Sequence, residues 1–387
     1  MRHLLIVSDF YAPHWTGLSK SIEGLAHRLA DKQTHVDILT VRHTPHLAPH
    51  EESADISIYR APPLIRISRT NYSLALLGWA ILRIRRCDTV LINSPCSNVL
   101  PIALLAKLLG RRVVLFHQGD LILPPHNALN RIVEWIFDIA THVGCLLADG
   151  LATYSQDYAQ HSRILHRYHH KTSTFILPQP ILPTNHEAAQ KHDQPPWVAQ
   201  MELLKSQGVV VFGCAGRFVH EKGLDVLFDA LLQLKKQKKD THIHILYAGA
   251  AMTYESYMDP YQDILAKLHA TITFTGLLHA HDLKQFYEVI DAFILPSRSD
   301  CFGLVQAEAL AAGKPLVVSN IPGARILVKD FGCGILFQSE SPQDLARAML
   351  AMSTSPTRYQ AEIAAARSFL NSPDHLKRAK MAFFPNR

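Results

Sequence analysis

The chain has 387 residues, of which 48% are hydrophobic and 19% charged, and it carries a formal net charge of +6 at pH 7. This length is too great for one ordinary domain, and the composition is globular, with enough apolar material for two cores. The six Cys form no C-x-x-C pair, which favours reduced thiols over a disulfide framework or a zinc site. No apolar run approaches the ~20 residues that a membrane span needs. Because Met1–His3 leads directly into the short run Leu4–Val7, we expect no signal peptide and a cytoplasmic protein.

The positive charge is concentrated in the first half. Residues 1–180 hold 18 Lys and Arg against 13 Asp and Glu, and most of these basic residues are Arg. One interpretation is contact with an anionic partner or with the inner face of a membrane. An ordinary solvated surface explains the same charge at least as well. We expect no nucleic-acid partner.

The first half alternates short apolar runs with amphipathic stretches. The apolar runs predict strands at His3–Ser8, His35–Val41, Thr89–Asn93, Arg112–His117 and Thr174–Leu177. The amphipathic stretches predict helices at Leu18–Ala30, Asn71–Arg86, Val99–Leu109, Leu129–Leu147 and Asp157–His166. Buried strands separated by helices predict a parallel sheet with helices on both faces.

A linker then interrupts the alternation. Residues 178–207 are rich in Pro, Asn, His, Gln and Lys, which is typical of a segment between domains. We therefore expect an N-terminal domain at 1–180, a linker at 181–206 and a C-terminal domain at 207–352. The helices of the remaining segment, 353–387, are expected to pack back on the N-terminal domain.

The second half repeats the pattern of the first. It predicts strands at Val209–Ala215, His242–Ala248, Thr271–Phe274, Ala292–Leu295, Leu316–Ser319 and Gly334–Phe337. It predicts helices at Gly223–Lys236, Pro260–Leu268, Ala280–Val289, Gly303–Ala312, Pro342–Met352 and Tyr359–Leu370. The fold class is therefore α/β, with two doubly wound Rossmann-like domains in tandem. Ligands of such sheets bind at the carboxyl ends of the strands, and two facing domains leave a central cleft for a site.

The segment Gly216–Gly223 follows a predicted strand and enters a helix. Arg217 and Lys222 flank its short loop, and the Arg fork with the mobile Lys charge suits a diphosphate. The two cations would neutralise a departing nucleoside diphosphate, a role that a metal fills elsewhere. The alternative is an ordinary solvated helix start with surface charges.

A second segment sets two carboxylates, Asp300 and Glu308, around a Phe302-Gly303 turn that opens a short helix. The backbone N–H groups and positive dipole end of a helix start suit a phosphate. Carboxylates beside it suit sugar hydroxyls, which donate hydrogen bonds. Phosphate and sugar together indicate a nucleotide sugar. The alternatives are a capping acid for Asp300 and a surface helix residue for Glu308.

Two further candidates follow strands of the first half. Gly17 lies after the first strand, where a residue without a side chain permits close approach of a ligand, although a tight turn explains it equally well. His117 ends the strand Arg112–His117, and with Asp120 it is able to orient or polarise a reacting hydroxyl. The chain has 23 His, and most are expected to be structural, so only its place at a strand end distinguishes His117.

The segment Ser73–Arg86 is apolar, contains a Trp and ends in Arg residues. One interpretation places it in a membrane interface, where its Arg residues contact anionic headgroups and the acceptor is lipid-linked. The alternative, which we favour, is a helix packed on the sheet with its polar end in water.

These segments, in this order, resemble the retaining glycosyltransferases of family four, the group 1 glycosyltransferases, which have the GT-B fold. The family's Gly-Arg-x-x-x-x-Lys-Gly block matches Gly216–Gly223. Its closing block, an acid followed by Phe-Gly and a later Glu, matches Asp300–Glu308. Phe274–Gly276 and Asp291 before Leu295–Ser297 also fit, so the resemblance covers nearly the whole chain.

The resemblance implies a role for each matched residue. Lys222 and Arg217 would hold the donor diphosphate, Glu308 the ribose hydroxyls and Asp300 the donor sugar. His117 would lie by the reacting carbon. The other implied donor-binding residues are Gly17, Gly216, Leu278, Phe302, Gly303, Leu304 and Val305. Among all these, the catalytic set would be His117, Arg217, Lys222 and Asp300.

Three departures from the family pattern bear on these roles. The first acid of the closing block is usually Glu, but here it is the shorter Asp300, so the sugar contact is expected to shift or to pass through a water. The N-terminal loop usually carries paired glycines, whereas Leu18 fills the second place here. The stretch after Ser319 usually leads to an acid, whereas here it leads to Arg325.

The implied activity is retaining transfer of a hexosyl group from a nucleoside-diphosphate sugar to a glycan or a lipid-linked acceptor, which the N-terminal domain would receive. The resemblance implies a front-face reaction, and no carboxylate stands out as a covalent nucleophile. We expect no cofactor and no metal, because no Asp-x-Asp triplet occurs in the chain. The alternatives are a sugar-nucleotide epimerase of the same fold, a sugar-binding protein and an inactive nucleotide-sugar-binding homologue.

Overall fold

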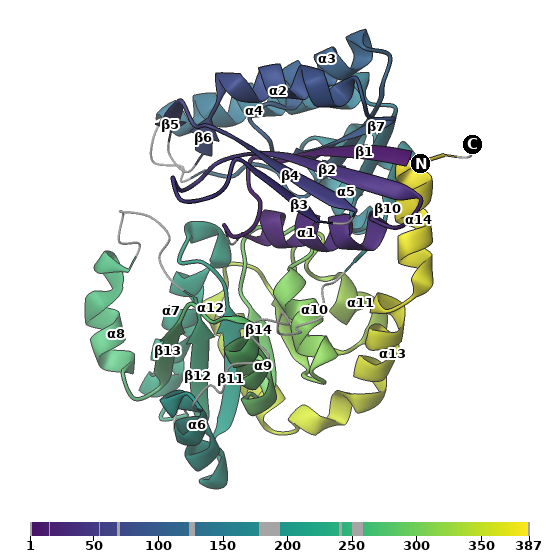
Figure 1. Cartoon of the computed structure of the whole chain (residues 1–387). Helices are drawn as coiled ribbons and strands as arrows, with labels where there is room; N and C mark the ends of the chain where they lie inside the picture. Colours follow the sequence, from purple (N-terminus) through teal and green to yellow (C-terminus); the bar gives the residue numbers. More distant parts are fainter. Residues whose placement is uncertain are drawn as a thin grey trace. The chain divides into compact units, whose positions relative to one another are not determined.

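The structure is a computed structural model that describes residues 2–14, 16–53, 55–67, 70–123, 128–177, 194–239, 242–249 and 258–385. The chain divides into two compact units (Figure 1). Unit 1 comprises Met1–Gln179 and Ser372–Arg387, and unit 2 comprises Pro180–Asn371. The C-terminal segment 353–387 is therefore divided between the two units. Its residues up to Asn371 belong to unit 2, and those from Ser372 onward belong to unit 1.

Unit 1 is built on an eight-stranded sheet in the order β10-β9-β8-β7-β1-β2-β4-β3. Neighbouring strands run parallel, except that β3 is antiparallel to β4. The strands are β1 (Arg2–Val7), β2 (Thr34–Val41), β3 (His50–Ser53), β4 (Ile56–Ala61), β7 (Thr89–Ser94), β8 (Arg112–His117), β9 (Gly150–Thr153) and β10 (Thr172–Thr174), while β5 (Ile65–Ile67) and β6 (Thr70–Tyr72) form a separate hairpin.

Helices cover both faces of this sheet, as predicted. In Figure 1, α2, α3 and α4 lie along one face and α1 along the other. The first face holds a core in which Leu76 and Ala80 of α2, Ile102 of α3 and Cys145 of α4 are buried. The helices are α1 (Gly17–Leu29), α2 (Leu74–Ile84), α3 (Val99–Leu108), α4 (Ala128–Leu147), α5 (Gln156–His161) and α14 (Pro373–Phe383), which packs on β9 and β10.

The predicted strand Thr174–Leu177 was placed too late. The strand β10 covers Thr172–Thr174, and the apolar run that prompted the prediction follows it. Phe175 and Ile176 are buried at 2% exposure each, and Phe175 packs against Phe116 and Phe383. Phe175 N–H still donates to Thr153 of β9 at 3.2 Å, whereas Ile176 N–H donates to the His375 side chain, so the apolar run continues past the end of the strand.

Unit 2 is built on a parallel six-stranded sheet in the order β13-β12-β11-β14-β15-β16. All six strands were predicted to within two residues at each end. They are β11 (Val210–Ala215), β12 (Ile243–Ala248), β13 (Ile272–Gly276), β14 (Ala292–Leu295), β15 (Leu316–Ser319) and β16 (Gly334–Phe337).

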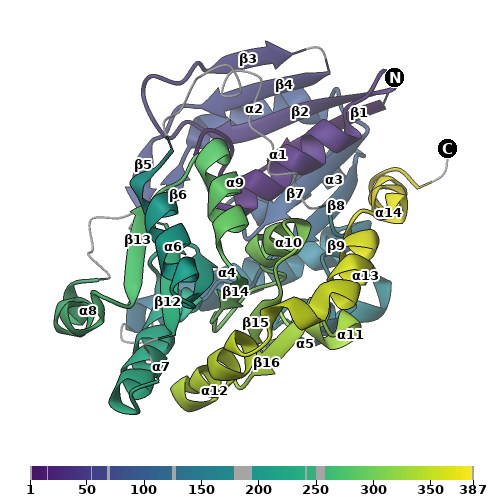
Figure 2. The same ribbon diagram turned by 90° about the horizontal axis from the view of Figure 1, so that it is seen from below.

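The helices of unit 2 lie on both faces of its sheet, with α7 and α12 along one face and α9 and α10 along the other (Figure 2). Two helices were not predicted. The C-terminal part of the predicted linker forms α6, which packs on β11 and α9, and a short helix, α11, precedes β16. The helices are α6 (Pro196–Ser206), α7 (Leu224–Lys236), α8 (Gln262–Leu268), α9 (Ala280–Val289), α10 (Leu304–Ala311), α11 (Ile326–Phe331), α12 (Pro342–Ser353) and α13 (Gln360–Leu370).

Candidate functional site

The candidate site in unit 2 lies where the strand order reverses. From β11 the chain proceeds outward through β12 and β13, then returns to β14 on the other side of β11. The carboxyl ends of β11 and β14 therefore form the switch point at which doubly wound sheets bind ligands. The loop that begins at Gly216 follows β11, and the loop that contains Asp300 follows β14.

Lys222 and Asp300 form an ion pair across this switch point. The Lys222 ammonium nitrogen lies 2.5 Å from Asp300 Oδ2. The other carboxylate oxygen, Oδ1, accepts a hydrogen bond from the backbone N–H of Gly303 at 2.9 Å. The two side chains are 23% and 12% exposed, so the pair is accessible to a ligand from one side. Two of the residues with predicted roles at the donor thus contact each other directly.

Arg298 holds the turn that carries Lys222, and the sequence reasoning missed it. Its guanidinium donates to both carboxylate oxygens of Asp225, at 2.7 and 2.6 Å, and to the carbonyl of His220 at 2.9 Å. Burial alone would raise the pKa of Asp225, but the hydrogen bonds and charge of Arg298 lower it. Because His220–Lys222 form a single 3-10 turn, this anchor positions the ammonium of Lys222.

Gly303 opens α10 in a backbone conformation that favours glycine. Its φ is 72°, and a Cβ there would lie 2.6 Å from a methyl carbon of Leu295. Phe302 beside it is fully buried. Leu304 and Val305 belong to the first helical turn, whose N–H groups have no acceptor within a helix. This turn therefore presents the amide donors and positive dipole end that an anion requires.

Glu308 lies on the same helix and is only 5% exposed. The hydroxyl of Tyr287, on α9, donates to Glu308 Oε2 at 2.8 Å. Burial, together with the charge of Glu308, raises the pKa of Tyr287 well above its usual value, so the phenol keeps its proton. No sequence signal connected Tyr287 to this carboxylate, because the two residues belong to different helices.

The remaining predicted residues of unit 2 lie at the ends of neighbouring strands. Gly216 follows β11, and its carbonyl accepts a hydrogen bond from the Tyr247 hydroxyl at 3.1 Å. Arg217 comes next and is half-buried. Leu278 lies in the loop after β13, half-buried beside the exposed Leu277. These positions share the carboxyl edge of the sheet with Lys222.

The predicted residues of unit 1 lie in the connection after β1 and at the end of β8. Gly17 begins α1, next to its cap Thr16, and a Cβ at this position would meet no atom within 4 Å. The space that a ligand would use is therefore open at Gly17 within its own unit.

His117 is buried, with 2% exposure, and both ring nitrogens have partners. Nδ1 lies 3.0 Å from Ser94 Oγ, and Nε2 lies 3.0 Å from Asp120 Oδ1. Asp120 also accepts from the Ser162 hydroxyl and from the backbone N–H of Arg163. Burial tends to raise the pKa of Asp120, but the hydrogen bonds, first of all from His117, hold it well below its usual range. The His117–Asp120 pair thus ties the end of β8 to the segment after α5.

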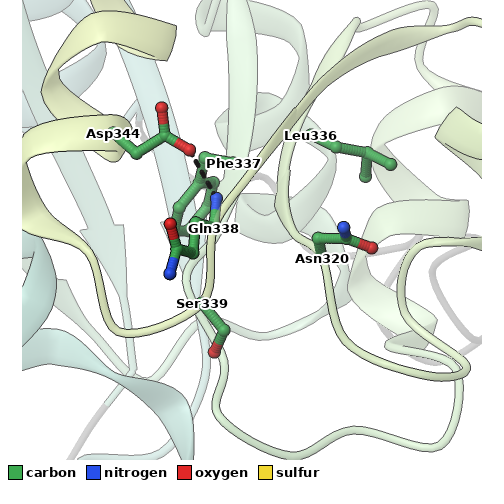
Figure 3. Close-up of a pocket in the computed structure, with 6 residues that line it drawn as sticks. All are labelled: Asn320, Leu336, Phe337, Gln338, Ser339 and Asp344. Carbon is green, nitrogen blue, oxygen red and sulfur yellow. Dashed lines mark hydrogen bonds between the residues drawn. The ribbon is translucent and has the colours of Figure 1, made fainter.

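A pocket of about 510 Å³ lies at the carboxyl ends of β15 and β16. Figure 3 shows its lining, which contains none of the predicted donor residues: Asn320, Leu336, Phe337, Gln338, Ser339 and Asp344. The backbone N–H of Gln338 donates to Asp344 at 2.6 Å, and Arg347 donates to the same carboxylate at 2.7 Å. This pocket lies apart from the loops after β11 and β14 that carry Lys222 and Asp300.

Within the described residues, no group of three or more His, Cys, Asp and Glu is arranged to hold a metal ion. None of the helices in that part of the chain has the length and apolar composition required to cross a bilayer.

The loop after β15 supports the Asp300 segment, and this contact yields a stability prediction. Gly323 has φ 83°, and a Cβ there would lie 2.3 Å from the carbonyl oxygen of Cys301. Gly313 has a similar φ of 78°, but a Cβ would meet nothing within 4 Å. We expect Gly323→Ala to cost roughly 1–3 kcal/mol more than Gly313→Ala, because only the first adds a steric clash. Thermal melts of the two variants measure the difference, and equal melting temperatures would contradict this account of the loop.

The fold is that of known sugar-transferring enzymes. The chain superposes on sucrose-phosphate synthase from Thermosynechococcus elongatus with a TM-score of 0.70 and 18% identity, over 99% of this chain and 95% of that one. It superposes on Anabaena HepE in complex with UDP-glucose with a TM-score of 0.66 and 17% identity, over 99% and 96% of the two chains. The architecture is therefore GT-B, as predicted.

The sequence comparisons relate one segment of the chain to a known family. Residues 199–369 match the model of the glycosyl transferases group 1. This segment makes up most of unit 2, and its match agrees with the resemblance seen in the sequence. A D-inositol 3-phosphate glycosyltransferase of Corynebacterium aurimucosum is 33% identical over 143 residues, which are 36% of this chain and 34% of the relative. The chain thus spans about a third of the length of this curated relative.

Proposed function

We propose that the protein is a retaining, metal-independent glycosyltransferase of family four that moves a hexosyl group from a nucleoside-diphosphate sugar to a glycan or lipid-linked acceptor. The observation that carries the proposal is the Lys222–Asp300 pair beside the start of α10, with Glu308 on the same helix. A cation, an anion-binding helix start and two carboxylates match the chemistry of a diphosphate joined to sugars. The match of residues 199–369 to the group 1 transferases supports the same assignment.

The ion pair supports the following proposal for donor binding. A diphosphate brings oxygen atoms that replace Asp300 as partners of Lys222, and Arg217 offers further donors at the end of β11. Asp300 is then free to accept hydrogen bonds from sugar hydroxyls, while Gly303 N–H holds its other oxygen. Glu308, fixed by Tyr287, accepts from the ribose hydroxyls.

The acceptor attacks the donor sugar on the same face of the sugar ring from which the diphosphate leaves. The bond from the anomeric carbon to the diphosphate oxygen breaks, and the acceptor oxygen bonds to the same carbon from the same side. The acceptor proton passes to the departing diphosphate, whose charge Arg217 and Lys222 stabilise. No protein carboxylate forms a bond to the sugar in this scheme, and no metal takes part. For Gly17 and His117 of unit 1 we propose the roles that the family resemblance implies, a donor-binding role for Gly17 and a catalytic role for His117.

The first experiment identifies the donor. Thermal shifts of the full chain with UDP-, GDP-, ADP- and TDP-sugars reveal the base, because a ligand that binds the folded state raises the melting temperature. UDP-glucose is the first probe, since the structurally similar HepE was crystallised with it. The selected donor is then assayed for transfer with EDTA present. A new glycosidic bond of retained configuration supports the proposal, whereas an epimerised sugar or a requirement for added metal contradicts it.

A further inference from the structure

The helix α4 of unit 1 exposes a run of large apolar side chains. Ile132, Trp135, Ile136, Ile139 and Leu146 are 54%, 65%, 52%, 43% and 63% exposed. Side chains of this size normally face a core. Here, burial in α4 is confined to Thr141, Gly144 and Cys145. The more apolar side of the helix therefore points away from the sheet.

The exposed residues lie on one face of α4. Ile132, Ile136 and Ile139 follow the i, i+4, i+7 spacing of a helical stripe, and Trp135 and Leu146 fall beside them. From Ile132 to Leu146 the stripe extends about 21 Å, at 1.5 Å per residue. It is thus a continuous apolar strip rather than a set of scattered side chains.

The neighbouring helix α3 widens this strip. α3 packs along α4, and its Leu104 and Leu108 are 43% and 81% exposed. Figure 1 shows α2, α3 and α4 side by side on the same face of the sheet of unit 1. Soluble monomers rarely expose apolar patches this extensive unless the patch binds something. Leu129, in the first turn of α4, is 60% exposed as well. We call these eight exposed large apolar residues of α3 and α4 the apolar strip.

The charge of unit 1 indicates what covers the strip. Unit 1 holds 22 Lys and Arg against 14 Asp and Glu, whereas unit 2 holds 17 against 19. The whole positive charge of the chain therefore belongs to the unit that carries the strip. The exposed Arg131 lies on α4 itself, and Arg85, Arg86 and Lys107 are exposed at the ends of α2 and α3. This combination of apolar strip and basic surroundings complements an anionic lipid surface.

We propose that the apolar strip docks unit 1 on an anionic lipid bilayer, with α4 lying in the plane of the interface. Trp135 is the side chain expected at the headgroup level, where Trp is enriched. A two-fold contact between copies through the same face would bring two units of like charge together, which opposes self-association. The proposal does not rest on the proposed transfer activity, because lipid binding is measured without a donor.

This assignment differs from the one based on the segment Ser73–Arg86. That segment forms α2, whose Leu76, Ala80 and Ile84 are buried against the sheet. The favoured alternative for it, a helix packed on the sheet, agrees with the structure. The helix α2 also exposes Leu74 and Leu82, at 71% and 56%, but the larger set of exposed apolar side chains lies on α4, where the sequence predicted only an amphipathic helix.

The test is co-sedimentation of the full chain with vesicles of phosphatidylcholine, with and without phosphatidylglycerol. We expect binding to the anionic vesicles that weakens as salt is raised, because screening reduces the contribution of the basic residues. The double variant Ile132→Ser, Ile136→Ser is expected to bind at least about tenfold less, since it removes apolar area from the interface. A matched control is Leu203→Ser, Met381→Ser, which replaces side chains of 60% and 64% exposure on α6 and α14.

Two further measurements make the result decisive. Trp fluorescence is expected to shift to the blue with anionic vesicles in the wild-type chain and much less in Trp135→Phe. Circular dichroism and size-exclusion chromatography with light scattering establish that each variant is folded and report its oligomeric state. Equal vesicle binding by the Ser variants of α4 and by the control overturns the proposal. The proposal is also overturned if the wild-type chain is a dimer and the double variant Ile132→Ser, Ile136→Ser is a monomer. The apolar strip would then be an interface between two copies of the chain.

Discussion

Replacing Lys222 by Ala is expected to lower kcat/KM for sugar transfer by roughly 10²–10³-fold, the range found when one preorganised donor to developing charge is removed. Lys222 reaches the switch point from a 3-10 turn that Arg298 and Asp225 fix. Its ammonium pairs with Asp300 Oδ2 at 2.5 Å. In the proposed reaction the diphosphate takes that place and gains charge as the sugar leaves, so the loss should fall mainly on kcat.

The fold should survive this substitution. Asp300 remains partly exposed and still accepts from the Gly303 N–H, so its carboxylate is not left buried without a partner. The matched control is Lys236→Ala, an exposed Lys in the last turn of α7. We expect the control to keep wild-type kinetics and both variants to keep the wild-type melting temperature within a few degrees. Near-normal turnover in Lys222→Ala would remove Lys222 from the site.

The sequence predicted the strands, turns and helices that carry the candidate site in unit 2, because the relevant signals are local. Parallel strands place their carboxyl ends at one edge, so loops after β11 and β14 had to converge near the switch point. The turn at Gly303 and the helix behind it follow from a short pattern of Phe, Gly and small apolar residues. The Lys222–Asp300 contact itself, between side chains 78 residues apart, was not predicted.

The sequence could not predict contacts between side chains that lie far apart along the chain. Tyr287 and Arg298 have no motif of their own, and their importance appears only when Glu308 and Asp225 are placed against them. The sequence also did not show the burial and the hydrogen-bond partners of individual polar side chains. His117 was singled out by its place at a strand end and was associated with Asp120, but nothing in the pattern showed that Ser94 occupies its other ring nitrogen.

The second large effect is expected at Glu308. Glu308→Gln should raise KM for the donor and lower kcat/KM by roughly 10–100-fold, because hydrogen bonds to a charged group are worth about 1.5–3 kcal/mol and the neutral amide makes weaker ones. Gln is the informative replacement, since it keeps an oxygen that accepts from Tyr287. Glu308→Ala removes that acceptor as well and should also lower the melting temperature. Glu288→Gln, an exposed carboxylate on neighbouring α9, is the matched control.

The role of the ribose contact is separable from that of the sugar contact. Calorimetric titration with the nucleoside diphosphate alone should reveal the defect of Glu308→Gln, because this ligand retains the ribose. Asp300→Asn should impair binding of the intact nucleotide sugar more than that of the diphosphate. Tyr287→Phe should cause a smaller defect of the same kind, and its effect should not add to that of Glu308→Gln, because the phenol acts through the carboxylate. Fully additive losses, or unchanged diphosphate binding in Glu308→Gln, would show that the carboxylate does not contact the ribose and that the structural pair with Tyr287 is its whole function.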